Sequence, residues 1–242
     1  MSDELKSSST PGQSSGSSET AKIEHRPSEL KAEQKELLHP EEAITSFLLI
    51  RHGHTRATET GLLYTDPAAE LTEKGVEQAK AVARWISNLN PDVLLCSSAK
   101  RVVDTASAIA DVLDIEPILS QQLSEWHVGD WEGRSYLDIK KKDPDVYMLW
   151  SQDPIRNRPP GGESIVDLCE RIAEHVQELI NRYSGRNVAL VTHAGIIRAI
   201  LISALGMPID NFWRISIPVG SVSRVDFSKN FATVHFVSAR PN

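Results

Sequence analysis

Short runs of consecutive apolar residues, separated by amphipathic stretches, constrain the fold of this chain more than any other feature of its sequence. The runs lie at 47–50, 93–96, 117–119 and 187–192. Uninterrupted apolar runs of this length are typical of strands that are buried on both faces of a parallel sheet. Apolar residues recur with helical spacing in the stretches 72–89, 99–113, 164–185 and 195–205. The alternation predicts an α/β fold, a three-layer sandwich with a mostly parallel central sheet and helices on both faces.

Other segments complete the predicted order of elements. Residues 222–226 and 233–237 are typical of two last strands, and the residues between them favour a hairpin. Ser164, with Asp167 three residues later, predicts a capped start for the long helix that follows. Residues 123–160 are rich in Trp, Tyr, Asp and Pro, and we expect them to be irregular.

The first 45 residues differ in composition from the rest of the chain. Ser, Thr, Gly and Pro dominate the beginning, and Glu and Lys dominate the part that follows. Such a segment has too little apolar surface to offset the entropy lost on ordering. We therefore expect residues 1–45 to form a disordered polar tail, not a signal peptide, because an apolar core is missing. Residues 46–242 are predicted to fold as one domain.

The composition argues against several classes of protein. No apolar run approaches the roughly 20 residues of a membrane-spanning helix, so no membrane association is predicted. The chain has 26 basic and 33 acidic residues and a net charge of -7, which argues against nucleic acid as a partner. Two cysteines, Cys96 and Cys169, exclude a disulfide scaffold and favour reduced thiols in a cytoplasmic protein. Nothing in the sequence indicates an oligomeric state.

Reactive side chains gather where the predicted strands end. Arg51 and His52 follow the first strand, and His193 follows the strand at 187–192. Arg101 lies just behind the second strand, and Glu125 follows the third. In open α/β sheets, ligands bind beyond the carboxyl ends of the strands. We therefore expect these two arginines, two histidines and one glutamate to share one edge of the sheet.

This set of side chains suits a phosphoryl group. Arginine forks fit phosphate oxygens, and Gly195 at a helix start lets a backbone amide approach an anion closely. One histidine can donate to the phosphoryl oxygens, while the other attacks phosphorus as a neutral imidazole and forms a phosphohistidine. The residues themselves leave open which histidine attacks. Glu125 is the one carboxylate in the set, so we expect it to protonate the leaving oxygen and later to activate water.

Other chemistries fit the sequence less well. His52 and His54 have the spacing of a metal-ligand pair, but no further ligand cluster stands at a strand end, so neither a metal nor another cofactor is predicted. The sequence contains no G-x-x-x-x-G-K, G-x-G-x-x-G or G-x-S-x-G motif. This argues against a kinase, a dehydrogenase and a serine hydrolase.

Six segments of the sequence resemble signatures of the histidine phosphatase superfamily, also called the phosphoglycerate mutase-like family. In chain order they are LIRHG at 49–53, LTEKG at 71–75, SSAKR at 97–101, EWHVGDWEG at 125–133, PGGES at 160–164 and THAG at 192–195. The resemblance covers residues 47–227 and implies the phosphoglycerate mutase-like fold for the catalytic domain. It implies that His52 is the nucleophile and Glu125 the acid and base. Arg51, Arg101 and His193 would hold the phosphoryl group.

Two positions depart from the family pattern. His54 stands where the family usually has Glu, and Thr58 stands where it often has Asn. Thr58 can still donate one hydrogen bond to a phosphate, so we keep it as a candidate substrate-binding residue together with Gly195.

The sequence therefore predicts a metal-independent phosphomonoester hydrolase that acts on a small phosphorylated metabolite through a covalent phosphohistidine. One alternative is a cofactor-dependent phosphoglycerate mutase. The mutases of this family usually carry a longer insertion where this chain has the short stretch 133–160. A second alternative is a non-catalytic phosphate-binding protein, which we would expect to lack His52, Arg101, Glu125 or His193. We expect substrate specificity to come from residues 123–160, with Arg156 and Arg158 among the candidates.

Overall fold

A computed structural model describes residues 43–60, 62–63 and 66–242 of the chain. A six-stranded sheet forms its centre, with the strand order β4-β3-β6-β1-β7-β8. The strands are β1 (Thr45–Arg51), β3 (Val93–Cys96), β4 (Pro117–Leu119), β6 (Asn187–Thr192), β7 (Val222–Phe227) and β8 (Ala232–Ala239). The strands β4, β3, β6 and β1 run parallel, and β7 pairs antiparallel with both β1 and β8. The predicted hairpin at the end of the chain is confirmed.

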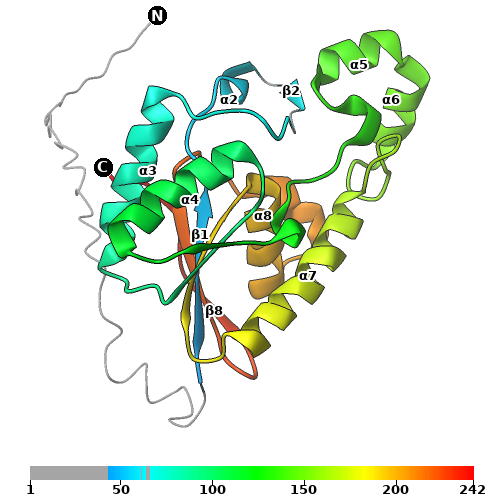
Figure 1. Cartoon of the computed structure of the whole chain (residues 1–242). Coiled ribbons are helices and arrows are strands. Elements are labelled where there is room, and N and C mark those ends of the chain that lie inside the picture. The colour runs from blue at the N-terminus through cyan, green and yellow to red at the C-terminus, as the bar shows by residue number, and fades with distance from the viewer. Residues whose placement is uncertain (1–42, 61, 64–65) are drawn as a thin grey trace, which may run out of the picture. The chain divides into compact units, whose positions relative to one another are not determined.

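Helices cover both faces of the sheet, as Figure 1 shows. On one face lie α3 (Glu73–Ser87) and α4 (Lys100–Leu113), and on the other lie α7 (Ile165–Arg182) and α8 (Ala194–Ala204). Because successive strand residues point to opposite faces, Leu48 and Ile50 of β1 pack with α3 and α4, whereas Phe47 and Leu49 pack with α7 and α8. The predicted three-layer α/β sandwich is confirmed.

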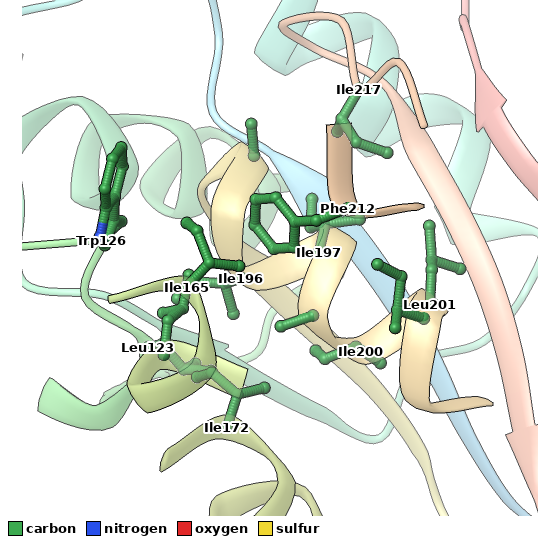
Figure 2. Packing of buried hydrophobic residues seen from close by; sticks show 14 of the residues in the cluster. Leu123, Trp126, Ile165, Ile172, Ile196, Ile197, Ile200, Leu201, Phe212 and Ile217 are labelled. Carbon is green, nitrogen blue, oxygen red and sulfur yellow. The ribbon is translucent and has the colours of Figure 1, made fainter. Parts of the chain in front are cut away.

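The larger of the two cores lies between the sheet and the pair α7 and α8. Ile165, Ile172, Ile196 and Phe212 all belong to this cluster (Figure 2). Ser164 caps α7 by accepting the N–H of Asp167 at 3.1 Å, and the Asp167 carboxylate accepts the N–H of Ser164 at 2.7 Å. The predicted capped start of this helix is therefore correct, and the cap fixes where α7 begins.

The prediction that residues 123–160 are irregular is wrong in part. After two short 3-10 turns at Gln121–Leu123 and Gly129–Trp131, the chain forms β5 (Arg134–Ser135), α5 (Tyr136–Lys142) and α6 (Pro144–Gln152). The strand β5 pairs with β2 (Leu62–Leu63), which follows the short helix α2 (Ala57–Thr60). A third 3-10 turn spans Ile209–Arg214. Trp150 is 6 % exposed and contacts Trp131, Tyr136 and Tyr147. This aromatic packing holds α5 and α6 in place, although hydrophobic periodicity did not predict these helices.

The predicted disordered tail, residues 1–45, lies almost entirely outside the described residues. Thr45 belongs to β1 and is buried, and its hydroxyl accepts the N–H of Gly185 at 3.3 Å. The folded unit therefore begins at least one residue before the predicted boundary. None of the described helices is long and apolar enough to cross a membrane. Both cysteines are free thiols, and burial raises the pKa of Cys96 to about 11.

Candidate active site

Two histidines meet at the carboxyl ends of neighbouring parallel strands. His52 directly follows β1, and His193 directly follows β6. The two rings lie edge to face with their centroids 5.4 Å apart, and the residues are 4 % and 1 % exposed. The β1–β6 register places Arg51 opposite Thr192, so the pairing of the two strands brings the histidines to the same level.

A single hydrogen bond fixes the protonation of the His52 ring. Its Nδ1 lies 2.8 Å from the carbonyl oxygen of Gly53. Because a carbonyl oxygen can only accept, Nδ1 carries the hydrogen and Nε2 keeps its lone pair. Arg101 points its Nε at this lone pair from 3.3 Å. The unprotonated nitrogen of His52 therefore faces the guanidinium of Arg101.

Arg101 connects the two histidines. It lies in the first turn of α4, is 4 % exposed, and donates from Nη1 to the carbonyl oxygen of Asp66 at 2.9 Å. Its Nη2 lies 3.3 Å from Nδ1 of His193. Since a guanidinium only donates, Nδ1 of His193 accepts, and its Nε2–H donates to Oγ of Ser97 at 3.0 Å. Ser97 at the end of β3 thereby orients the second histidine.

Arg51 supplies a second, half-buried cation at the same place. Its Nη1 donates to the carbonyl oxygen of Ile217, and its Nε is buried and has no hydrogen-bond partner among the described residues. Buried donors are normally satisfied, so an unpaired guanidinium nitrogen beside two histidines is typical of an anion site. Burial lowers the pKa of Arg51, and the charge of Glu125 opposes this shift.

Glu125 lies against the first turn of α8, which His193 precedes. One carboxylate oxygen, Oε1, accepts the backbone N–H of Gly195 at 3.1 Å and that of Trp126 at 3.0 Å. A Cβ atom at position 195 would collide with this oxygen, so a glycine is required for the contact. The first turn of α8 therefore holds the carboxylate in place.

Burial sets the protonation of both histidines. Burial lowers the pKa of His52 well below its usual value, and the charges of Arg101 and Arg51 lower it further. Burial is also the main cause that lowers the pKa of His193, and interactions with His52 and Arg101 lower it further. Both rings are therefore neutral at pH 7, the state that a nucleophilic imidazole requires.

The loop that carries His52 rests directly on the first turn of α3. A Cβ atom on Gly53 would overlap the carbonyl oxygen of Gly75, and one on Gly75 would overlap the carbonyl oxygen of His54. The N–H of Gly53 donates to Oγ1 of Thr105 at 3.1 Å, and the N–H of His54 donates to Oε1 of Gln78 at 2.8 Å. The backbone of this loop is thus held from both α3 and α4.

A cavity of about 220 Å³ opens in front of these side chains. Arg101, Glu125 and His193 line it, together with Ser97 and Glu132. Of the predicted catalytic residues, Glu125 and His193 line this cavity, whereas His52 lies behind it, in contact with Arg101.

Comparison with known proteins agrees with this geometry. The histidine phosphatase superfamily (branch 1) matches residues 47–239. The chain belongs to the histidine phosphatase superfamily. It is 28 % identical over 192 residues to the adenosylcobalamin/alpha-ribazole phosphatase of Escherichia coli (strain K12), covering 79 % of this chain and 95 % of the relative.

Further relatives in the histidine phosphatase superfamily include a second named phosphatase. The glucosyl-3-phosphoglycerate phosphatase of Mycolicibacterium vanbaalenii is 31 % identical over 76 % of this chain and 84 % of that protein. The crystal structure of the alpha-ribazole phosphatase from Shigella flexneri superposes with a TM-score of 0.75 at 27 % identity, covering 81 % of this chain and 97 % of that chain. The predicted family, the fold and the assignment to histidine-type phosphatases are confirmed.

Two predicted members of the histidine phosphatase site have other contacts in this structure. Thr58 is exposed, and its hydroxyl donates to the carbonyl oxygen of Thr55 at 2.6 Å. The N–H of Gly195 is engaged by Glu125. Their direct contact with a phosphate stays a prediction, as do the roles of the other site residues.

His54 stands where the family usually has Glu. Both of its ring nitrogens lie near residues outside the group formed by His52, Arg101 and His193. Its Nδ1 lies 2.8 Å from Oγ1 of Thr72, and its Nε2 lies 3.1 Å from Oε1 of Glu59. His54 thus links α2 to the start of α3.

Arg198 on α8 was not among the site residues predicted from the sequence. Its Nε donates to the carbonyl oxygen of Ile215 at 2.9 Å, and its guanidinium carbon lies 5.4 Å from the ring centre of Trp213. Burial lowers the pKa of Arg198, and the nearby charge of Glu125 raises it. A single cation in the otherwise apolar helix Ala194–Ala204 was the available signal, since a buried charge requires a partner.

Proposed function

We propose that this chain is a phosphomonoester hydrolase that acts on a small phosphorylated metabolite through a phosphohistidine at His52. The observation that carries the proposal is the lone pair on Nε2 of His52, which lies 3.3 Å from Nε of Arg101, a residue that lines the cavity. A neutral imidazole held by a backbone carbonyl is ready to attack without first losing a proton. The adjacent arginines neutralise the phosphoryl oxygens, which would otherwise repel the attacking lone pair.

In the first step, Nε2 of His52 attacks phosphorus and the ester P–O bond breaks. Arg51 and Arg101 supply two positive charges to the phosphoryl oxygens, and His193 lies beside them. Glu125, within the same cavity, gives its proton to the leaving alcohol. The products of this step are the free alcohol and a phosphohistidine.

In the second step, water attacks the phosphohistidine and the P–N bond breaks. The carboxylate of Glu125 accepts the proton from the attacking water, so the residue regains the proton that it gave in the first step. Inorganic phosphate leaves and His52 returns to its neutral form. The acid and base are then ready for another turnover.

The phosphoglycerate mutase reaction is the second candidate. It would need the phosphoryl group to return from His52 to a hydroxyl of the same class of substrate. The stretch 133–160, which would close the cavity against water, contains only β5, α5 and α6 before the turn that leads to α7. A site that water can enter favours hydrolysis.

Phosphate release from the full chain tests the proposal. We expect release from p-nitrophenyl phosphate and from a panel of phosphorylated metabolites, with the same rate after treatment with EDTA. Among the described residues, no group of three His, Cys, Asp or Glu side chains is placed to hold a metal ion. Activity without a metal is a prediction that the EDTA treatment tests. A rate no higher than that of His52→Ala would contradict the proposal. Conversion of 3-phosphoglycerate to 2-phosphoglycerate would favour the mutase.

A further inference from the structure

We propose that the catalytic cavity selects phosphomonoesters whose alcohol part carries no second negative charge, and that Glu132 discriminates against acidic alcohols. The inference rests on the proposed phosphatase function and names the substrate class for the same cavity. Sugars, nucleosides, polyols and amino alcohols fit this class. Phosphate esters of hydroxy acids and bisphosphates do not.

The positive charge of Arg51 and of Arg101, which lines the cavity, is matched by the phosphoryl group alone. Arg51 and Arg101 carry one charge each, while burial lowers the pKa values of His52 and His193 and leaves both rings neutral at pH 7. A phosphate monoester is close to a dianion near neutral pH. The two arginines therefore balance the phosphoryl group, and Arg198, whose charge interacts with Glu125, does not line the cavity.

The rest of the cavity wall is neutral or acidic. Beyond the residues around the phosphoryl group, its lining consists of Pro67, Ser98, Ala99, Ser124, His127 and Glu132. Arg101 is the one Lys or Arg that lines the cavity among the residues that the structure describes. Within the domain, the undescribed residues 61 and 64–65 are Gly, Tyr and Thr, which carry no charge. Hydroxyl groups can pair with the two serines, whereas a substrate carboxylate would meet Glu132.

Arginines in the segment after Glu125 are already paired with carboxylates. Arg134 contacts Asp143 at 2.6 Å and Asp138 at 3.0 Å, and Arg171 contacts Glu163 at 2.8 Å. Such pairs neutralise the cations before a substrate arrives.

The same holds for the two arginines that the sequence suggested as specificity residues. Arg156 contacts Asp210 at 3.0 Å and Asp153 at 3.2 Å. Arg158 contacts both oxygens of Asp167, each at 2.6 Å. Neither lines the cavity, so Glu132, not a cation of this segment, is the charged group at its outer wall.

Glu132 has the position that such a selection requires. It follows the 3-10 turn Gly129–Trp131 and is exposed, whereas Trp131 beside it is 1 % exposed and packs on Trp150. The buried tryptophan anchors the turn, and the carboxylate projects from a fixed backbone. Repulsion by one fixed like charge is a common device by which a site rejects the wrong partner.

Two esters of nearly the same shape test the inference. Glycerol 3-phosphate carries a hydroxymethyl group where 3-phosphoglycerate carries a carboxylate. At pH 8, we expect kcat/KM of the full chain for glycerol 3-phosphate to be about tenfold higher, the order of one poorly screened like-charge contact. In Glu132→Gln this ratio should fall several-fold, and in Glu132→Lys it should fall further. Glu116→Gln alters an exposed acid at the opposite end of the sheet, before β4, and should keep the wild-type ratio.

The outcomes separate this inference from the proposed function. No phosphate release from p-nitrophenyl phosphate would overturn the proposed function and this inference with it. Release from p-nitrophenyl phosphate together with an equal or higher kcat/KM for 3-phosphoglycerate would overturn the inference alone. A ratio that stays the same in both Glu132 variants would overturn the role of Glu132. Because Glu132 is exposed and the two variants differ in charge, a folding defect in one leaves the other as a test.

Discussion

The backbone N–H of Gly195 donates to both carboxylate oxygens of Glu125, at 3.1 Å and 3.4 Å. This contact joins the start of α8, just after His193, to the segment that follows β4. An amide in the first turn of a helix is an unpaired donor at the positive end of the helix dipole, and it therefore orients an anion well. The contact holds the predicted proton donor against the helix turn that follows His193, and both residues line the same cavity.

Replacement of Glu125 by Gln should reveal its role as an acid. Gln keeps a side-chain oxygen that can accept the N–H of Gly195, but it cannot transfer a proton. General acid catalysis contributes about 10²- to 10⁴-fold, so the phosphorylation of His52 by an alkyl phosphate should slow by that order. The measurement is the single-turnover burst, because dephosphorylation also uses Glu125.

An ester with a good leaving group is the control for this variant. p-Nitrophenol leaves without protonation, so the burst with its phosphate ester should slow far less in Glu125→Gln. Equal slowing with both esters would mean that Glu125 only positions the substrate. The proton donor would then have to be sought at His127, which lines the same cavity.

His52→Ala should abolish both turnover and the trapped intermediate. With wild type, acid quenching after brief incubation with a ³²P-labelled substrate should yield an acid-labile phosphoenzyme. The variant should give none, because the Nε2 lone pair is lost. His175→Gln, which alters a histidine that contacts Ser120 and Glu178, should still form it. Label on another residue of an active His52→Ala enzyme would show that the nucleophile is elsewhere.

The free energy of unfolding should fall as the pH drops below about 6.5. In the folded chain the pKa values of His52 and His193 lie well below their usual value, mainly because of burial. The unfolded state therefore binds protons first as the pH falls, and each histidine removes about 1.4 kcal/mol of stability per pH unit. Above pH 7 both rings are neutral in either state and this contribution is flat.

Urea titrations at several pH values check this dependence. His193→Asn should reduce the slope below pH 6.5 by about one proton. Ser98→Ala, which removes a nearby hydroxyl and no titratable group, should keep the wild-type slope. An unchanged slope in His193→Asn would mean that this ring takes up its proton in the folded state as readily as in the unfolded chain.

Removal of residues 1–42 should leave the melting temperature and the turnover rate unchanged. The segment is too polar to contribute to a core. Removal of residues 1–46, by contrast, also deletes Thr45 and Ser46, which are buried and hydrogen-bonded to the turn before β6. We expect that cut to cost about 1–3 kcal/mol. Scanning calorimetry on both truncated chains distinguishes the two, and a large loss in the shorter truncation would contradict the prediction.

Local sequence patterns were sufficient for the sheet and for the residues at its carboxyl edge. Apolar runs such as 47–50 and 187–192 are unambiguous because strands buried on both faces need no polar alternation. The parallel pairing of β1 with β6 then places His52 and His193 together by geometry alone. Arg101 and Glu125 were predicted at the same edge because they follow the second and third strands.

What the sequence did not reveal depends on contacts between distant segments. The helices α5 and α6 are held by Trp150 and its aromatic neighbours, not by an apolar stripe of their own. Arg156 and Arg158 were expected to determine specificity, yet both pair with aspartates that only the fold brings near. The alternative partners of Thr58 and His54 are likewise set by the local turn and by α3.

The contact between Gly53 and Gly75 makes two signatures of the sequence a single unit. R-H-G and L-T-E-K-G are separated along the chain, but a side chain on Gly53 would overlap the backbone of Gly75, and a side chain on Gly75 would overlap the backbone of His54. A methyl group at position 75 would push back the backbone of His54, two residues after the predicted nucleophile His52. Mutational tolerance at the two sites should therefore be coupled, and a redesign of α3 has to treat its first turn as part of the catalytic loop.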